Sequence, residues 1–339
     1  MHPTTIAVDL AKSVFQVSIA NQADRIIDRK RLTRSQFERF ISQQEPTMIV
    51  MEACATANYW SQFAQAHGHE TKLLHPLYVK PFVRRNKTDA ADADGLLRAH
   101  GDPQLLPVPT KQPAQQALQG LHRIRQQLIR TRTGRITLAR ALLAEFGVSL
   151  PRGTGDICNR LTLQIEHLPV IIHHDLQEVV AEIQSLKQRL DQLDKTLAGL
   201  AKHDPVAQQL MSIPGIGITT ATAMIASVPN IHLFTRARQF ASWLGLTPRE
   251  HSSGNKRRLG AISKQGDSYL RMLLVHGARS AITQAHRQRA KDETNLSDLQ
   301  RWVLKLDAEK PRNIATVALA NKMARLIWVT WTEARAYTP

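Results

Sequence analysis

The sequence predicts an α/β domain followed by two mainly helical regions. Over the first 100 residues, short apolar runs rich in β-branched residues alternate with helical patterns. Four prolines then mark a stiff segment between residues 103 and 113. Beyond it, apolar residues recur at helical spacing. We therefore expect an α/β domain at 1–102, a linker and long helical coiled-coil segment at 103–204, and a mostly α domain at 205–339.

The first domain is predicted to begin with three strands joined by short turns. Strand patterns cover 4–9, 14–20, 25–32, 47–52 and 71–74. Helical patterns begin at Thr33, whose hydroxyl can cap a helix, cover 59–67, and continue to residue 100. This order, with acids at strand ends, is that of a ribonuclease-H-like fold. Sugar kinases and actin-like ATPases begin in the same way, but they need Gly-rich phosphate loops later in the chain, and the sequence has none.

Four carboxylates near the N-terminus form the first candidate site. Asp9 and Glu52 each close a buried-strand pattern, at or near its exposed end. Asp89 and Asp92 lie at i and i+3 of an Ala-rich helical pattern, so they share one helix face. Carboxylates gathered in this way repel one another unless a cation lies between them, and hard oxygen ligands favour Mg²⁺ or Mn²⁺. The four acids therefore predict a divalent-metal centre for phosphoryl transfer.

Each acid taken singly is more simply explained as a helix cap or a turn former. The metal centre is favoured by the four together and by the neighbouring cations Arg84, Arg85 and Lys87, which we expect to contact nucleic acid. Asp94 lies two residues beyond Asp92 and faces another side of the helix, so we expect it to be solvated.

The charge balance predicts a polyanionic partner. The net charge is +17, from 45 Lys and Arg against 28 Asp and Glu, and nucleic acid is the first candidate. A membrane surface is the competitor, but no run approaches the roughly 20 apolar residues of a spanning helix. The N-terminus lacks signal-peptide features, and the chain has only 2 cysteines. We therefore expect a cytoplasmic protein without disulfides or a zinc site.

A long basic helix is predicted after the prolines. Residues 103–144 contain no Asp or Glu, but they carry six arginines: Arg123, Arg125, Arg130, Arg132, Arg135 and Arg140. A charge run is usually a solvated helix face, yet an acid-free run of this length would repel itself without a counter-charge. A phosphate backbone is the better explanation, and arginine also suits folded RNA.

A second long helix carries a leucine-rich seam. Its apolar residues step alternately by three and four, as in a coiled coil: Leu176, Val179, Ile183, Leu186, Leu190, Leu193, Leu197 and Leu200. Packing against the basic helix in a helical hairpin is one explanation. Self-association of the chain is the other, and the sequence leaves both open.

Two further stretches are candidates for phosphate contact. Ile213-Pro214-Gly215-Ile216-Gly217 has the helix-hairpin-helix signature, in which Gly215 and Gly217 bring the backbone close to a phosphate, although such hairpins can be purely structural. Residues 245–258 form a polar loop, where a serine beside glycine is normally a turn residue. In that loop Ser252 and Ser253 precede three cations that can hold a phosphate and steady an alkoxide: Lys256, Arg257 and Arg258.

Motifs in both halves of the chain point to one family. The N-terminal motifs are Val8-Asp9, Met51-Glu52-Ala53-Cys54 and Lys87-Thr88-Asp89-Ala90-Ala91-Asp92-Ala93. The C-terminal motifs are Ile213–Gly217, Gly245–Pro248, Ser252-Ser253-Gly254 and Ile262–Asp267. Together they resemble the DEDD domain and the C-terminal domain of the insertion-sequence transposases called the one-ten family, eleven-eleven subgroup, relatives of the Piv invertases. After Cys54 the family commonly has glycines, whereas this chain has Ala55-Thr56-Ala57.

The resemblance implies a RuvC-like domain in which Asp9, Glu52, Asp89 and Asp92 bind Mg²⁺ or Mn²⁺. It implies a second domain whose nucleophilic serine, Ser253 or its neighbour Ser252, becomes covalently joined to DNA. It also implies a tetramer, a dimer of dimers, with active sites shared between protomers. The implied partners are donor and target DNA and a structured noncoding guide RNA that pairs with both. Two alternatives remain open: a RuvC-like junction nuclease without a covalent intermediate, and a non-enzymatic nucleic-acid-binding protein.

Overall fold

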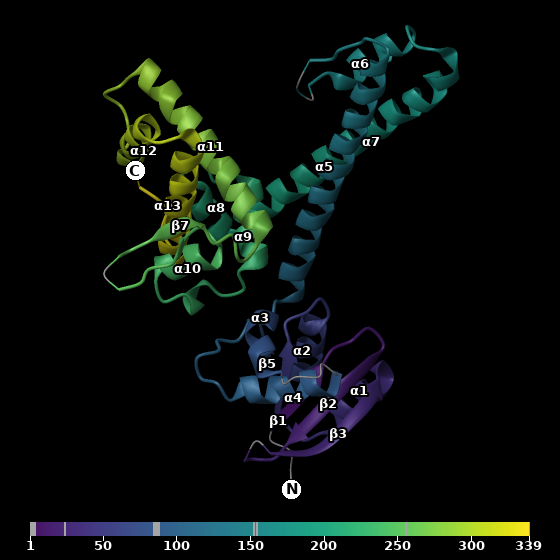
Figure 1. Ribbon diagram of the computed structural model, residues 1–339, viewed down its shortest axis with the longest axis vertical. Helices are drawn as coiled ribbons and strands as arrows, with labels where there is room; N and C mark the ends of the chain where they lie inside the picture. The colour runs from purple at the N-terminus through teal and green to yellow at the C-terminus, as the bar shows by residue number, and fades with distance from the viewer. Residues whose placement is uncertain are drawn as a thin grey trace. The chain divides into compact units, whose positions relative to one another are not determined.

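The computed structural model describes residues 5–23, 25–83, 89–151, 153, 155–254 and 256–338, with the backbone alone at residues 89 and 90. Tertiary contacts divide the chain into two compact units, 1–113 and 114–339 (Figure 1). The sequence predicted three parts, with boundaries after residues 102 and 204. That division stays a prediction.

The first unit is built around a five-stranded sheet. Its strands are β1 (Thr5–Asp9), β2 (Val14–Ala20), β3 (Ile26–Thr33), β4 (Met48–Glu52) and β5 (Glu70–Leu74). Their order across the sheet is β3-β2-β1-β4-β5; β1 is antiparallel to β2 and parallel to β4. This arrangement fits the ribonuclease-H-like fold that the order of the elements predicted.

Helices cover both faces of this sheet. On one face lie α1 (Arg34–Gln43) and α2 (Ala57–Ala66); on the other lie α3 (Pro76–Val79), the 3-10 turn η1 (Lys80–Phe82) and α4 (Asp89–His100). Thr33 caps α1 as predicted, in a capping box with Gln36. The rings of Phe15, Phe37 and Trp60 meet edge to face under α1 and α2, with centroids 5.1 Å apart.

The proline-marked segment after α4 runs along the first unit as far as residue 111. The amide of Val108 donates to the carbonyl oxygen of Leu73 at 2.7 Å, which adds a bridge at the β5 edge. The amide of Lys111 donates to Asn58 Oδ1 in α2 at 2.9 Å. The segment expected to be a stiff linker is therefore anchored on the sheet edge and on α2, because its backbone groups find partners there.

The second unit begins with a helical hairpin. Helices α5 (Pro113–Glu145) and α7 (His173–His203) pack side by side, with α6 (Ile157–Ile165) and the 3-10 turn η2 (Val170–Ile172) between them in the chain (Figure 1). Leu128 of α5 packs against Leu186 and Leu190 of α7. Much of the leucine seam is thus buried within the chain, which is the first of its two explanations, while Leu200 stays 47% exposed. Self-association stays a prediction.

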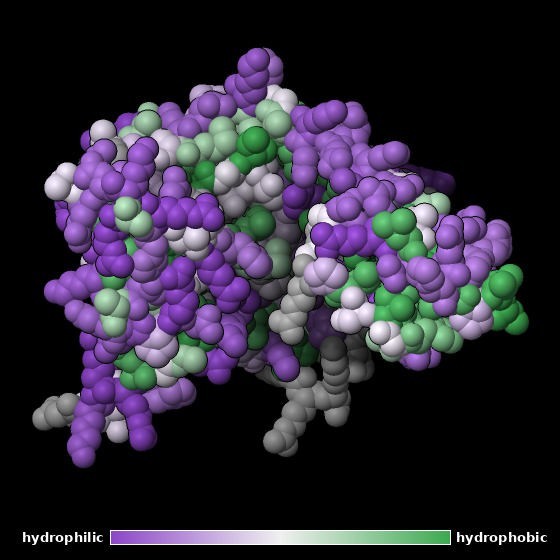
Figure 2. Space-filling view, turned by 90° about the horizontal axis from the view of Figure 1, so that it is seen from above, coloured by the Kyte–Doolittle hydropathy of each residue, from purple (hydrophilic) through white to green (hydrophobic). Residues whose placement is uncertain are grey.

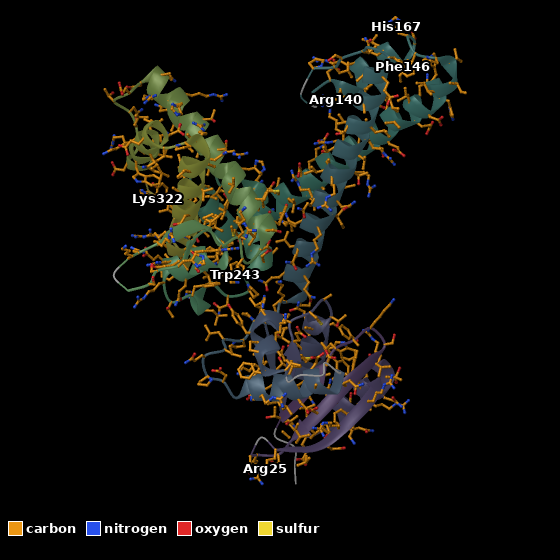
Figure 3. All side chains as sticks on the ribbon, in the orientation of Figure 1. Arg25, Arg140, Phe146, His167, Trp243 and Lys322 are labelled. Carbon is orange, nitrogen blue, oxygen red and sulfur yellow. The ribbon has the colours of Figure 1, made fainter. Side chains whose placement is uncertain are left out.

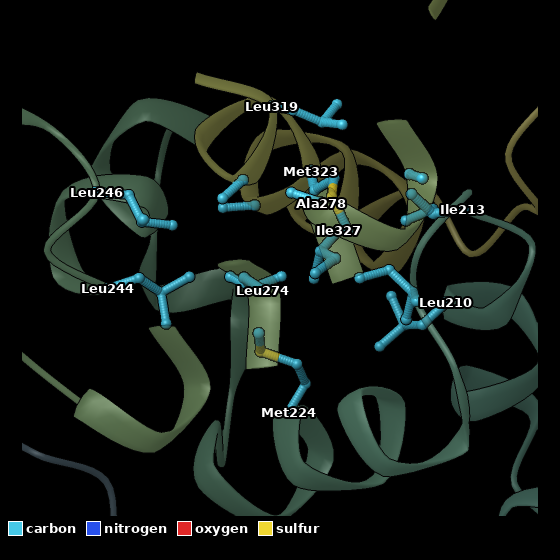
Figure 4. Packing of buried hydrophobic residues seen from close by; sticks show 14 of the residues in the cluster. Leu210, Ile213, Met224, Leu244, Leu246, Leu274, Ala278, Leu319, Met323 and Ile327 are labelled. Atoms are coloured by element: carbon cyan, nitrogen blue, oxygen red, sulfur yellow. The ribbon is translucent and has the colours of Figure 1, made fainter. Parts of the chain in front are cut away.

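The remaining elements pack around one apolar core. They are α8 (Pro205–Met211), α9 (Ile218–Ser227), the 3-10 turn η3 (Ile231–Leu233), α10 (Ala237–Trp243), β6 (Pro248–Glu250), β7 (Leu259–Ile262), α11 (Ser268–Lys291), α12 (Asp298–Glu309) and α13 (Arg312–Thr332). Leu210, Met224, Leu274 and Met323 belong to this core (Figure 4).

The surface is largely hydrophilic on the face drawn in Figure 2, where hydrophobic side chains appear in small groups. Within the described ranges, no helix combines the length and apolar character needed to cross a membrane.

Candidate functional site

Asp9 and Glu52 end two neighbouring parallel strands. Val8 pairs with Met51 in the register of β1 and β4, and the two acids are the residues that directly follow this last pair; adjacent strands lie about 4.8 Å apart. Side chains two residues apart in a strand point to the same face of the sheet. Ala7 and Val50, two residues before Asp9 and Glu52, are buried in the cluster under α4, so both acids belong to that face. The structure therefore brings the two strand acids together on the face that α4 covers.

The other two predicted ligands belong to α4. Asp92 lies on this helix and is partly exposed, while Asp89 is its first residue and has a side chain outside the described part. Arg84, Arg85 and Lys87 also lie outside the described residues. Among the described side chains, no three His, Cys, Asp or Glu residues form a group that could hold a metal ion. The donor set still fits a hard divalent cation, since carboxylates of two adjacent strand ends and of α4 supply only oxygen.

Asp94 is not solvated, and that prediction was wrong. Its carboxylate accepts from Ser18 Oγ at 2.7 Å and from Arg29 at 2.8 and 3.2 Å, and its side chain is only 16% exposed. Burial opposes its ionisation, but the hydrogen bonds from Arg29 and Ser18 outweigh burial and hold the pKa of Asp94 below its usual range. Asp94 thereby fixes α4 on β2 and β3. Asp92 lies about 200° away around the helix and so occupies the other flank.

The serine stretch is a β-hairpin whose root is fixed by two glycines. A Cβ on Gly245 would lie 2.0 Å from the carbonyl oxygen of Gln265, and one on Gly266 would lie 1.9 Å from that of Trp243 (labelled in Figure 3). Both glycines have positive φ, +71° and +79°. Arg271 ties the same two loops together by donating to one carbonyl oxygen in each, at 3.1 and 3.0 Å. The motifs Gly245–Pro248 and Ile262–Asp267, at the two ends of the hairpin, therefore form its root.

The two serines at the hairpin tip have different surroundings. Ser252 Oγ donates to Glu250 Oε1 at 2.8 Å and accepts from the amide of Arg258 at 3.0 Å. Ser253 begins the turn, and its carbonyl oxygen accepts from the amide of Lys256 at 3.2 Å. Its side chain is exposed, and its hydroxyl forms no hydrogen bond within the part of the chain that the structure describes. Ser252 therefore supports the turn, while the Ser253 hydroxyl is available to a ligand.

The charged groups at the tip are exposed and mostly positive. Glu250 is the acid of the hairpin; the hydrogen bond from Ser252 and the positive charge of Arg257 hold the pKa of Glu250 below its usual range. Its carboxylate lies 3.4 Å from Arg257 Nε. Lys256 and Arg258 are exposed on the same turn. A phosphate reaching the tip would therefore meet cations around Ser253.

Half of the arginines predicted on the basic helix are engaged inside the chain. Arg125 pairs with Asp194 of α7 at 2.6 and 3.3 Å, and Arg135 pairs with Glu182 of α7. Arg140 (labelled in Figure 3) donates to backbone carbonyls of the loop after α5. Part of the counter-charge expected from a phosphate backbone thus comes from α7, because the hairpin sets its acids opposite the acid-free helix. Arg123 and Arg130 are exposed, and Arg132 is half-buried.

The two glycines of the predicted helix-hairpin-helix motif have separate roles. Gly215 has φ +88°, and a Cβ there would lie 2.6 Å from the carbonyl oxygen of Gly277 in α11. Close packing inside the core therefore explains Gly215. Gly217 is exposed before α9, and a Cβ there would contact nothing within 4 Å. Of the two, Gly217 is the one placed to approach a ligand.

A buried polar cluster that the sequence did not predict joins α5, α9 and α11. His122 is 2% exposed; its Nδ1 lies 3.2 Å from the Tyr269 hydroxyl and its Nε2 lies 3.0 Å from Thr222 Oγ1. Burial, with a smaller contribution from the charge of Arg125, lowers the pKa of His122 to about 4, so the ring is neutral at pH 7. A single histidine in a basic helix gives no signal of such partners, which lie 100 and 147 residues away.

Known proteins match the chain in both halves. Residues 207–294 match the family described as Transposase IS116/IS110/IS902 family, and residues 6–147 match the DEDD transposase family of IS110, described as Transposase. The chain is 38% identical to a probable family 20 transposase of Pseudomonas aeruginosa over all of both proteins. It is 35% identical to the transposase for insertion sequence element IS1111A of Coxiella burnetii, over 98% of this chain and 90% of that protein.

A more distant relative is the pilin gene-inverting protein of Moraxella bovis, 26% identical over 65% of this chain and 63% of that protein. The matched segments include both regions described above, the strand-end acids of the first unit and the serine hairpin of the second. The chain therefore belongs to the IS116/IS110/IS902 family of insertion-sequence transposases, enzymes that cut and rejoin DNA.

Proposed function

We propose that this transposase cuts and rejoins DNA through a covalent bond between Ser253 and a DNA phosphate. The observation that carries the proposal is the hydroxyl of Ser253. It is exposed at the hairpin tip and unengaged by any described residue, whereas the Ser252 hydroxyl is engaged by Glu250 and by the amide of Arg258. The packed root holds the hairpin, so a fixed scaffold presents an accessible nucleophile.

In the proposed step the Ser253 oxygen attacks the scissile phosphorus and a DNA oxygen leaves. One phosphodiester bond forms as another breaks; the serine proton is lost to a base, and the leaving oxygen takes up a proton. Lys256, Arg257 and Arg258 attract the phosphate and stabilise the charge that develops on its oxygens. The phosphodiester bond energy is retained, so attack by another DNA hydroxyl rejoins the strand without ATP.

Asp9, Glu52, Asp89 and Asp92 are the proposed holders of Mg²⁺ or Mn²⁺. When bound, such an ion neutralises phosphate charge and lowers the pKa of an attacking hydroxyl. The register of β1 and β4 supports this role for Asp9 and Glu52, and the contacts of Asp94 hold the helix that carries Asp92 on the sheet.

We further propose that a structured noncoding RNA guides the reaction and that the chain acts as a tetramer, a dimer of dimers. The motifs shared with the family support both proposals. The exposed guanidinium groups of Arg123 and Arg130 on α5 suit folded RNA through phosphate contacts and stacking.

A RuvC-like nuclease is the second candidate function. The ribonuclease-H-like order of the sheet favours it, because acids at those strand ends can serve hydrolysis by water without any serine. Such an enzyme would release cut DNA and form no protein–DNA bond.

A covalent-adduct assay separates the two functions. Purified protein, the RNA flanking its element, Mg²⁺ and labelled donor DNA are combined and resolved on a denaturing gel, and the attached residue is mapped by mass spectrometry. We expect an adduct at Ser253 that is lost in Ser253→Ala, retained in Ser252→Ala and dependent on the RNA. An adduct at Ser252 would reassign the nucleophile, and cut DNA with no adduct would establish the nuclease.

A further inference from the structure

Helix α11 has an exposed side that is rich in hydrogen-bond donors and free of acids. None of its 24 residues is Asp or Glu. Its buried side chains, which include Leu274, Ala278 and Ile282, occupy one side of the helix. The other side carries five exposed residues, called here the α11 polar face, which line a hollow of about 470 Å³: Arg279, Ser280, Thr283, Gln284 and Arg287.

The two arginines of the α11 polar face keep their charge unneutralised. Arg287 forms no hydrogen bond or ion pair with any residue that the structure describes. Arg279 donates to the uncharged side-chain oxygen of Asn313 at 3.3 Å. Asp307 of the neighbouring α12 is already paired with His286 and Arg312. This differs from α5, where acids of α7 neutralise Arg125 and Arg135.

The spacing of the donors indicates what they can bind. Arg287 lies eight positions after Arg279, which is about 12 Å along the helix. Duplex DNA carries one phosphate about every 3.4 Å of axis on each strand, so two cations about 12 Å apart can contact different phosphates of the same duplex. Ser280 and Gln284 place two uncharged donors between the arginines, and such side chains contact phosphate oxygens and base edges. The Thr283 hydroxyl already donates to the carbonyl oxygen of Arg279 at 3.0 Å. A face with this charge would repel a metal ion or a basic partner.

From these observations we infer that the α11 polar face binds the phosphate backbone of duplex DNA. The inference deepens the proposed function, since a transposase must hold the DNA that it cuts. It assigns binding to a helix outside the hairpin and outside the strand-end acids, and it requires neither a covalent serine bond nor a metal ion. It therefore stands or falls separately from the proposed chemistry.

Salt-dependent binding tests this inference. The full chain is titrated against a fluorescent DNA duplex without divalent metal, at several salt concentrations. Loss of one phosphate contact lowers the slope of log K against log salt by about 0.9 in magnitude. We expect that decrease in Arg279→Gln and in Arg287→Gln, and about 1.8 in the double variant. Both positions are exposed, so circular dichroism and melting temperature are expected to match the unmodified protein.

Arg289→Gln is the matched control. Arg289 is exposed on the same helix, about 200° around the axis from Arg287, so its loss removes an equal charge from another side. Its slope is expected to equal that of the unmodified protein. Unchanged slopes in both face variants, or an equal change in the control, would overturn the inference. A parallel titration with duplex RNA checks the partner: a slope change for RNA and none for DNA would overturn the assignment to DNA.

Discussion

The strand-end acids and the hairpin serines are held in opposite ways. Asp9 and Glu52 end strands with ladder partners on both sides, under a helix that Asp94 fixes to the sheet. Ser253 lies on an exposed two-stranded hairpin that is fixed at its root by the close approach of Gly245 and Gly266 to facing carbonyls. Metal ligands must be held within about 0.5 Å of their productive geometry, while a nucleophile on an exposed tip can reach a large substrate. Each arrangement suits one of the two proposed roles.

The largest expected effect is on the acid side of this comparison. Asp9→Asn keeps the shape of the side chain but removes its charge, so DNA cleavage is expected to fall by roughly 10³-fold or more, about 4 kcal/mol of transition-state stabilisation. Single-turnover adduct yield measures it. Asp94→Asn is the control: it weakens the contact with Arg29, is expected to cost about 1 kcal/mol of folding stability, and leaves cleavage intact in the folded protein. If both variants lost cleavage equally, the loss in Asp9→Asn would be explained by a shift of α4 and would give no support to metal binding by Asp9.

On the hairpin side the next largest effect is expected from the root. Gly266→Ala places a Cβ 1.9 Å from the carbonyl oxygen of Trp243 at a positive φ, so the backbone must move. We expect a loss of about 3 kcal/mol in the free energy of unfolding, measured by urea denaturation. Gly260→Ala, in β7, is the control, because its Cβ would lie at an ordinary 3.8 Å from the carbonyl oxygen of Arg249. If Gly266→Ala were as stable as the control, the backbone at the root would be able to accommodate the added Cβ, and the root would not be rigid.

The contrast also explains what the sequence predicted and what it did not. The order of strands and helices along the chain, the cap of α1 at Thr33 and the placement of Asp9 and Glu52 at the ends of strands follow from local patterns. The solvated Asp94 was a wrong prediction because its partner Arg29 is 65 residues away. Arg125 likewise finds Asp194 across 69 residues. A sequence shows where charged residues lie, but the packing of distant elements decides which of them form ion pairs.

A more gradual effect, spread over a range of pH, is expected from His122, which contacts α9 and α11. Its pKa is about 4 in the folded chain and near 6.5 when unfolded, so the unfolded state binds more protons between these values. Stability is therefore expected to fall as the pH drops through this window, by up to about 1.4 kcal/mol per pH unit. Urea denaturation at several pH values measures it. In His122→Gln this part of the pH dependence should disappear; an unchanged dependence would show that His122 is already charged, or that other groups govern the acid response.

The smallest expected effect distinguishes the two serines from each other. Glu250→Gln keeps an oxygen that accepts from the Ser252 hydroxyl but removes the negative charge beside Arg257. If Ser253 is the nucleophile, Glu250 only shapes the turn, and the rate of adduct formation should change by less than about tenfold. A general base contributes roughly 10²–10⁴-fold, so a loss of that size would identify Glu250 and Ser252 as the reacting pair. Ser252→Ala gives the matched comparison, because it removes the same hydrogen bond from the other side. Small losses in both variants leave the exposed Ser253 as the group that meets the phosphate.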